Sequence, residues 1–244
     1  MIDVHCHLEY MENPNEILKT AKEKGMLGLI SSVAEPKDAQ KILTLSEKWP
    51  NFLYVSLGFH PDSIENYNEK EILEYENFIE KNRGKIIAIG EIGLDYFHQL
   101  TEKEKIQQKK IFQRFLQLAQ KLNLPVVLHC REAFEDLFSI LKEEKTERVC
   151  LHCFSGSEGI LKEAIKRGYF ISFATNICYT KKHPRLAQKT PIEKLLLETD
   201  SPWLDPDSPK TLTNRPWKIE KSAKIIAQIK NLTPEKILEM SAKN

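Results

Sequence analysis

The sequence predicts a (β/α)8 barrel, an α/β fold of TIM type, and two observations lead to this prediction. Eight short apolar runs rich in β-branched residues recur along the chain, and segments with helical periodicity separate them. This alternation is typical of a parallel sheet whose strands are joined by helices. The length of 244 residues is close to the roughly 250 residues of such a barrel, so we expect one domain over residues 1–244.

The predicted strands are short apolar runs bounded by helix or turn signals. In chain order they cover Ile2–His7, Leu27–Val33, Phe52–Gly58, Ile86–Glu91, Pro125–His129, Val149–Phe154, Tyr169–Phe173 and Leu195–Thr199. The predicted helices between them, several with capping residues or early acidic residues, cover Asn13–Lys24, Pro36–Lys48, Glu69–Lys81, Thr101–Leu122, Glu132–Lys142 and Ser157–Lys166. Two closing helices are expected near Pro216–Lys230 and Pro234–Lys243.

The helix Thr101–Leu122 has the clearest pattern. Its apolar residues, including Ile111, Phe115 and Leu122, fall mainly on one side, as in a helix packed against a core. Thr101 and Glu104 have the spacing of a capping box. We therefore expect this helix to begin at Thr101 and to pack against the barrel.

Composition and charge indicate a globular protein and argue against a strongly basic or a membrane-spanning one. The chain is 41% hydrophobic and 29% charged, as in an ordinary globular protein, and 36 basic residues against 35 acidic ones leave a formal charge of +1. Any phosphate binding must then be local, because no overall basic field exists. The apolar runs are too short for a membrane helix and no leader precedes them, so we expect a cytoplasmic protein without membrane contact. We also favour a monomer.

Ionisable side chains lie at the carboxyl ends of the apolar runs. They are His5, His7, His60, Glu91, His129, His152 and Asp200. In a β/α barrel those strand ends meet at one mouth, where catalysis usually occurs. Nitrogen and carboxylate oxygen donors in this number favour two divalent cations such as zinc, manganese or magnesium, with Glu91 as the bridging carboxylate.

These positions also carry a resemblance to a known family. His5-Cys6-His7-Leu8, Gly58-Phe59-His60-Pro61, "GEIGLDY" at Gly90–Tyr96, "PVVLHCREA" at Pro125–Ala133, "HCFSG" at His152–Gly156 and "LLETDSP" at Leu196–Pro202 resemble, in order, the motifs of the TatD-type metal-dependent deoxyribonucleases. The resemblance covers nearly the whole chain. It implies a barrel enzyme that hydrolyses phosphodiester bonds in DNA with bound divalent metal. Because the near-neutral charge favours a strand end, we expect exonuclease action, in the 3′-to-5′ direction.

The resemblance also implies roles for individual residues. His5 and His7 would bind the first metal together with Glu91 and Asp200, whereas Glu91, His129 and His152 would hold the second. His60 matches the histidine near the substrate phosphate.

Other roles follow from position. Asp200 is our candidate for accepting the proton of the attacking water, so that Glu91 and Asp200 are the expected catalytic residues. Arg131 could bind a phosphate, and Trp203 could stack on a base. The near-neutral charge favours single-stranded DNA or strand ends over duplex DNA as the partner.

Several alternatives remain open from the residues alone. Barrel ligand sets of this type also serve hydrolases of small amides, lactones or phosphoesters, and a non-catalytic metal-stabilised binding protein would have the same ligands. A salt bridge would explain Arg131, and packing would explain Trp203. Strand alternation should turn Cys6, Cys130 and Cys153 away from the mouth as buried thiols. We expect His98 and His183 to lie on the surface, because their neighbours are polar.

Overall fold

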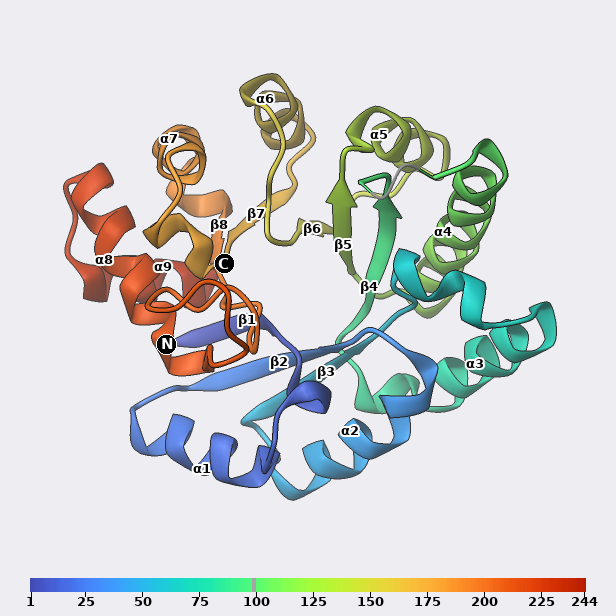
Figure 1. The fold of residues 1–244 in the computed structure, drawn as a ribbon, viewed down its shortest axis with the longest axis horizontal. Coiled ribbons are helices and arrows are strands. Elements are labelled where there is room, and N and C mark those ends of the chain that lie inside the picture. Colours follow the sequence, from blue (N-terminus) through green and yellow to red (C-terminus); the bar gives the residue numbers. More distant parts are fainter. Residues whose placement is uncertain (98–99) are drawn as a thin grey trace.

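The computed structural model describes residues 1–97 and 100–244, and these residues form one eight-stranded parallel sheet surrounded by helices (Figure 1). The strands follow one another in chain order around the sheet. They are β1 (Ile2–Cys6), β2 (Gly28–Val33), β3 (Leu53–Leu57), β4 (Ala88–Asp95), β5 (Val126–Arg131), β6 (Val149–Leu151), β7 (Phe170–Phe173) and β8 (Leu195–Leu197). The predicted (β/α)8 barrel is confirmed.

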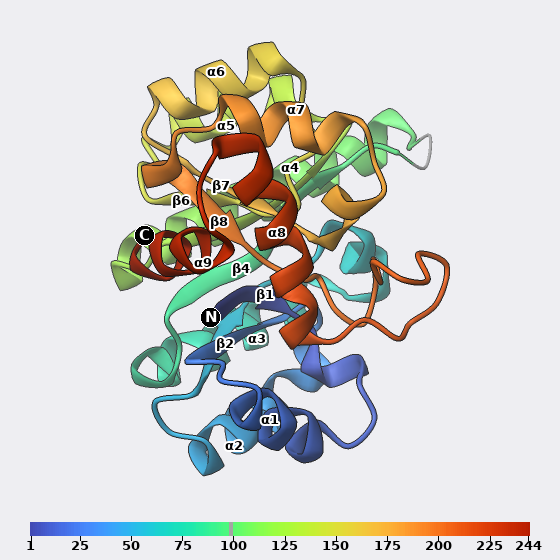
Figure 2. The ribbon, with the colours of Figure 1, turned by 90° about the vertical axis from the view of Figure 1, so that its left-hand side faces the viewer.

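The helices lie outside the strands, as Figures 1 and 2 show from two directions. They are α1 (Pro14–Glu23), α2 (Pro36–Lys48), α3 (Glu69–Lys81), α4 (Glu102–Leu122), α5 (Phe134–Glu143), α6 (Glu158–Lys166), α7 (Lys182–Lys189), α8 (Ile219–Lys230) and α9 (Pro234–Lys243). No helix within residues 1–97 and 100–244 is long and apolar enough to cross a membrane.

The segment after β8 closes the ring against β1. The Asp200 amide donates a hydrogen bond of 3.0 Å to the carbonyl of His5, and the His7 amide donates one of 2.8 Å to the carbonyl of Ser201. The buried Asp3 carboxylate accepts from both the amide and the hydroxyl of Thr199, at 2.9 and 2.5 Å. These contacts place the end of β1 beside Asp200.

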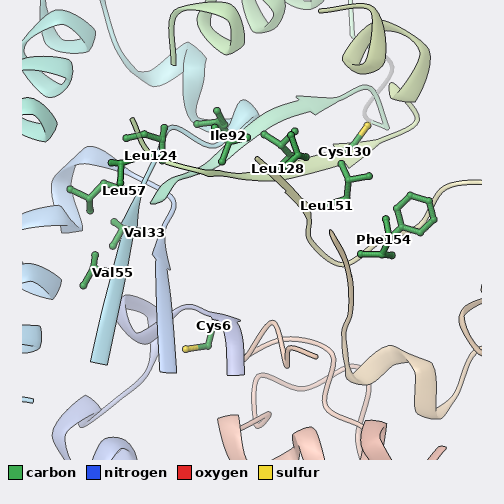
Figure 3. Packing of buried hydrophobic residues seen from close by; sticks show 14 of the residues in the cluster. Cys6, Val33, Val55, Leu57, Ile92, Leu124, Leu128, Cys130, Leu151 and Phe154 are labelled. Atoms are coloured by element: carbon green, nitrogen blue, oxygen red, sulfur yellow. The ribbon is translucent and has the colours of Figure 1, made fainter. Parts of the chain in front are cut away.

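The predicted α4 has the expected capping box and buried face. Thr101 accepts a hydrogen bond from the Glu104 amide, and Glu104 accepts one from the Thr101 amide. Phe115 is fully buried, with its ring centre 5.7 Å from that of Phe59. Figure 3 shows another part of the core, in which Leu128 of β5 and Leu151 of β6 lie close together.

Two expectations about elements were incomplete. Strand β4 continues four residues beyond Glu91 to Asp95, so Asp95 lies on a strand. The Asp95 amide donates a hydrogen bond to the side-chain oxygen of Gln108 in α4. Helix α7 was not predicted, because only three of its eight residues, His183, Leu186 and Ala187, are buried and four of the other five are polar. Its apolar pattern is too weak to be recognised without the barrel beside it.

Candidate metal centre

His5 and His7 stand together at the end of β1. Residues two apart on a strand share a face, and the two Nε2 atoms lie 3.0 Å apart, with both side chains buried. The sequence-based prediction that they converge is therefore correct.

Glu91 lies at the centre of the cluster, buried to 2% exposure. One carboxylate oxygen, Oε1, lies 2.7 Å from His152 Nε2, 2.9 Å from His129 Nδ1 and 3.4 Å from His60 Nε2. The other, Oε2, lies 3.4 Å from His5 Nε2 and 3.5 Å from His7 Nε2. The two oxygens thus face two different groups of histidines.

Asp200 completes the group on the β1 side. Its Oδ1 lies 3.5 Å from His7 Nε2 and 3.8 Å from His5 Nε2. The residue comes three positions after the end of β8 and has a left-handed backbone, with φ of 55°. Asn214 holds the turn after it, because its side-chain amide donates to the carbonyls of Thr199 and Trp203 at 2.9 and 2.7 Å.

Three carboxylates orient histidines of the cluster. None of the three was expected at the site. Glu9 lies 3.1 Å from His7 Nδ1, Asp95 lies 2.8 Å from His129 Nε2, and Glu198 lies 3.3 Å from His152 Nδ1. In a neutral ring that donates to a carboxylate, the other nitrogen carries a lone pair. When its ring is neutral, each of these histidines therefore directs the nitrogen that carries the lone pair toward the cluster, the arrangement common around metal ligands.

One sequence feature could have indicated that Glu9 and Glu198 belong to the site. Glu9 follows the predicted strand Ile2–His7, and Glu198 lies inside the predicted strand Leu195–Thr199. A charge buried at either place needs a partner. The sequence showed the charges but not which histidine each one contacts.

The side chains fit divalent cations by donor type and by spacing. Three sets of residues bring three ligand atoms within 4.8 Å of one another: His5, His7 and Asp200; His5, Glu91 and His152; and His60, Glu91 and His129. Two ligands of one zinc ion, each about 2.0–2.1 Å from it, lie roughly 3.0–3.4 Å apart. The observed separations of 2.7–3.5 Å around Glu91 are compatible with that geometry.

The charges of the cluster stabilise one another. Burial works to raise the pKa of Glu91, but the charges of His152 and His60 and the hydrogen bond from His129 hold it well below its usual value. Burial likewise opposes the protonation of His152, whereas Glu91 and Glu198 raise the pKa of that histidine well above its usual value. Without a metal, the positive charge that stabilises the Glu91 carboxylate therefore comes from protonated histidines.

The cluster lines a cavity of about 590 Å³ at the mouth of the barrel. The three residues expected to contact substrate, His60, Arg131 and Trp203, also line it. The guanidinium of Arg131 lies 3.3 Å from the ring centre of Phe97, whereas the Trp203 ring packs edge-on against His7 and Tyr10, each at 5.2 Å. All nine predicted site residues thus meet in one place.

Residues 2–244 match the family model described as TatD related DNase. The chain belongs to this family. The membership confirms the resemblance seen in the sequence motifs and the enzyme class that it implies, a metal-dependent hydrolase of the deoxyribonuclease type.

Relatives of the TatD family match over most of their length. The chain is 32% identical to human "Deoxyribonuclease TATDN3", covering 100% of this chain and 92% of that protein. It is also 32% identical to "3'-5' ssDNA/RNA exonuclease TatD" of Erwinia tasmaniensis, covering 84% of this chain and 81% of that protein. The crystal structure of YJJV, a TatD homologue from Escherichia coli, superimposes with a TM-score of 0.90 at 27% identity, covering 100% of this chain and 95% of that one.

Two expectations near the TatD site were wrong. His183 is not on the surface: it is 8% exposed and lines the cavity. Cys153 also lines the cavity instead of turning away, because β6 ends at Leu151 and the backbone at Cys153 is left-handed, with φ of 41°. Strand alternation no longer applies there. Cys6 is buried and does not line the cavity, as expected, whereas Cys130 is buried but also contributes to the cavity wall. His98 lies outside the described residues.

Proposed function

We propose that this chain hydrolyses phosphodiester bonds at the end of single-stranded DNA, in the 3′-to-5′ direction, at a centre of two divalent cations. The observation that carries the two-metal proposal is the position of Glu91, whose two oxygens face different histidine groups. The Erwinia relative, a 3'-5' ssDNA/RNA exonuclease by name, supports the strand preference and the direction.

The ligands divide around Glu91. His5, His7 and Asp200 would hold one cation, and His129 and His152 the other, with Glu91 shared. Bound magnesium, manganese or zinc would lower the pKa of a water and neutralise the charge that develops on the phosphate. Glu9, Asp95 and Glu198 would accept the N–H of their histidines, so that in the neutral ring the nitrogen facing the cation carries the lone pair.

Asp200 is the proposed proton acceptor. Burial raises its pKa, but the hydrogen bond with His7 and the charges of His152 and His5 lower it below the usual value. Its carboxylate is therefore ionised at neutral pH, and 18% of its side-chain surface is accessible. It can accept the proton of a water that attacks phosphorus from the open side of the cavity.

Three further side chains would position the substrate. Arg131 can donate two parallel hydrogen bonds to a phosphate, and His60 lies on the same side of Glu91 as His129. Trp203 would stack on a base, because its ring is only partly buried at the cavity wall.

A second cavity gives the strand a path away from the centre. It has a volume of about 660 Å³ and shares Arg131 and Ser155 with the first. Lys182 lines it and would add a positive charge beside the backbone of the strand.

The net charge of +1 favours a strand end over a long duplex. We propose in addition that the protein acts as a monomer in the cytoplasm.

The decisive experiment is cleavage of end-labelled single-stranded DNA by metal-stripped protein to which magnesium, manganese or zinc is returned. A ladder that shortens from the 3′ end, requires metal and is absent in Asp200→Asn supports the proposal. The exposed Glu74 provides the matched control Glu74→Gln, which should cleave like the unaltered chain. Protein that binds metal but cleaves no DNA would point instead to a hydrolase of small esters or amides.

A further inference from the structure

His183 lies on the wall of the metal cavity, although no role for it follows from the proposed ligand set. It belongs to the first turn of α7, is 8% exposed, and lines the same cavity as Glu91 and Asp200. Its Nε2 atom is buried and has no hydrogen-bond partner among the residues that the structure describes. A buried polar atom of this kind is costly unless something binds to it.

The neighbouring hydroxyl determines which nitrogen of His183 carries the proton. Thr180 Oγ1 lies 2.9 Å from the Asn176 carbonyl oxygen and 2.7 Å from His183 Nδ1. Two oxygens at 2.9 Å require a proton between them, and only the hydroxyl can provide it. The Thr180 hydroxyl therefore donates to the carbonyl and accepts from Nδ1–H of His183.

The ring is neutral at physiological pH. Burial, with a smaller contribution from the adjacent charge of Lys182, lowers the pKa of His183 to about 4. With the single ring proton on Nδ1, the Nε2 atom is a hydrogen-bond acceptor.

A second acceptor lies seven residues earlier in the chain. Asn176, in the short 3-10 helix Thr175–Cys178, uses its side-chain N–H to donate to Cys153 Sγ at 3.7 Å. Its Oδ1 atom is buried without a partner in the described part of the chain, and the residue lines the same cavity. This wall of the cavity thus contains two buried acceptors that have no partner among the described residues.

We propose that His183 Nε2 and Asn176 Oδ1 bind an N–H or O–H donor on the terminal nucleotide of the substrate. The inference rests on the proposed function and adds to it how a strand end is recognised. Phosphodiesters and the internal sugars of DNA have no hydrogen-bond donors, and two acceptors would repel a phosphate. The donors that a DNA strand does carry are the N–H groups of its bases and its terminal hydroxyl.

Two substitutions of His183 separate the acceptor from the rest of the side chain. In His183→Asn the amide can replace Nδ1–H beside Thr180, but nothing reaches the position of Nε2. In His183→Gln the longer amide can bring its oxygen to that position. Gln188→Asn, at an exposed position of the same helix, is the matched control.

The substrates are three single-stranded oligonucleotides that differ only in the 3′-terminal residue. The residues are thymidine, 3′-deoxythymidine, which lacks the terminal hydroxyl, and N3-methylthymidine, which lacks the only N–H of the base. We measure kcat/KM for removal of that residue in the presence of manganese, and metal content in parallel.

The unaltered chain should discriminate against one of the two modified ends by about ten- to hundredfold, as expected when a buried acceptor loses its partner. The end that is rejected identifies the donor as hydroxyl or base. Discrimination should fall below about threefold in His183→Asn, be partly restored in His183→Gln and remain complete in Gln188→Asn.

Other outcomes would overturn the inference without touching the proposed function. Efficient cleavage of all three ends by the unaltered chain is one, and discrimination that His183→Asn leaves intact is another. Loss of bound metal in His183→Asn would make the residue a metal ligand instead. If no oligonucleotide is cleaved, the proposed function fails, and equilibrium binding of the same three ends, measured by fluorescence anisotropy, still decides whether the acceptors select a donor.

Discussion

Nδ1 of His152 lies 3.3 Å from Oε1 of Glu198, and that same oxygen accepts a hydrogen bond of 2.7 Å from the Cys153 amide. The carboxylate is fully buried. It therefore connects β8 to the end of β6 and determines which nitrogen of His152 faces Glu91.

Replacing Glu198 by glutamine should weaken metal binding without removing a ligand. The neutral amide holds the imidazole less firmly and makes its free nitrogen less basic, which typically costs about 10–100-fold in metal affinity. Competition with a chromogenic chelator measures this change. Glu193→Gln, at an exposed position just before β8, should leave the affinity as it is, and equal affinities in both variants would refute an orienting role for Glu198.

Replacing Glu91 by glutamine should affect both cation positions together. The shared carboxylate supplies one oxygen to each group of histidines, so its loss should reduce bound metal from two ions per chain to at most one. The rate of DNA cleavage should fall at least about a hundredfold, since the charge that the cations neutralise in the transition state is then poorly compensated. Elemental analysis and cleavage assays measure the two effects, and a variant that keeps two tightly bound ions would contradict the bridging role.

Metal affinity should increase with pH up to about pH 9. Burial lowers the pKa of His129, but the hydrogen bonds with Asp95 and Glu91 outweigh burial and raise that pKa to about 9. A cation requires the unprotonated ring and must displace this proton at lower pH. The dissociation constant for manganese, measured between about pH 6 and about pH 9.5, should therefore fall with pH, and less steeply in His129→Gln.

The stability of the metal-free chain should change with pH in the opposite direction. Since the folded-state pKa of His129 is raised, its contribution is fully present below the ordinary histidine pKa of 6.5 and is lost as the pH rises through about 9. Urea unfolding after chelator treatment measures this effect. Stability that increased over the same range would show that another group dominates.

Asn214→Ala should loosen the turn that carries Asp200. The Asn214 side chain donates to the carbonyls of Thr199 and Trp203 and to the Thr175 hydroxyl, at 2.7–2.9 Å. Its removal leaves buried acceptors unpaired, which we expect to lower the free energy of unfolding by about 2 kcal/mol. Asn66→Ala, at an exposed position, is the control in urea unfolding. Unchanged stability would show that water replaces the amide.

Much of the fold could be predicted because its signals are local. A strand of a parallel barrel is a short apolar run, and the runs at Ile2–Cys6 and Leu195–Leu197 are visible without any knowledge of their neighbours. Helix α4 shows its cap and its apolar side within its own residues. Helix α7 does not, since most of its residues are polar and its packing depends on the barrel.

The sequence by itself determined the barrel, the family and the residues that meet at its mouth, because ionisable groups at successive strand ends must converge once the strands are parallel. Only the tertiary structure decided which oxygen of Glu91 faces which histidine, and which carboxylates orient the rings. It also placed His183 on the cavity wall, although the sequence had predicted a surface position. These relationships depend on contacts between residues far apart in the chain, whose distances and burial no local pattern contains.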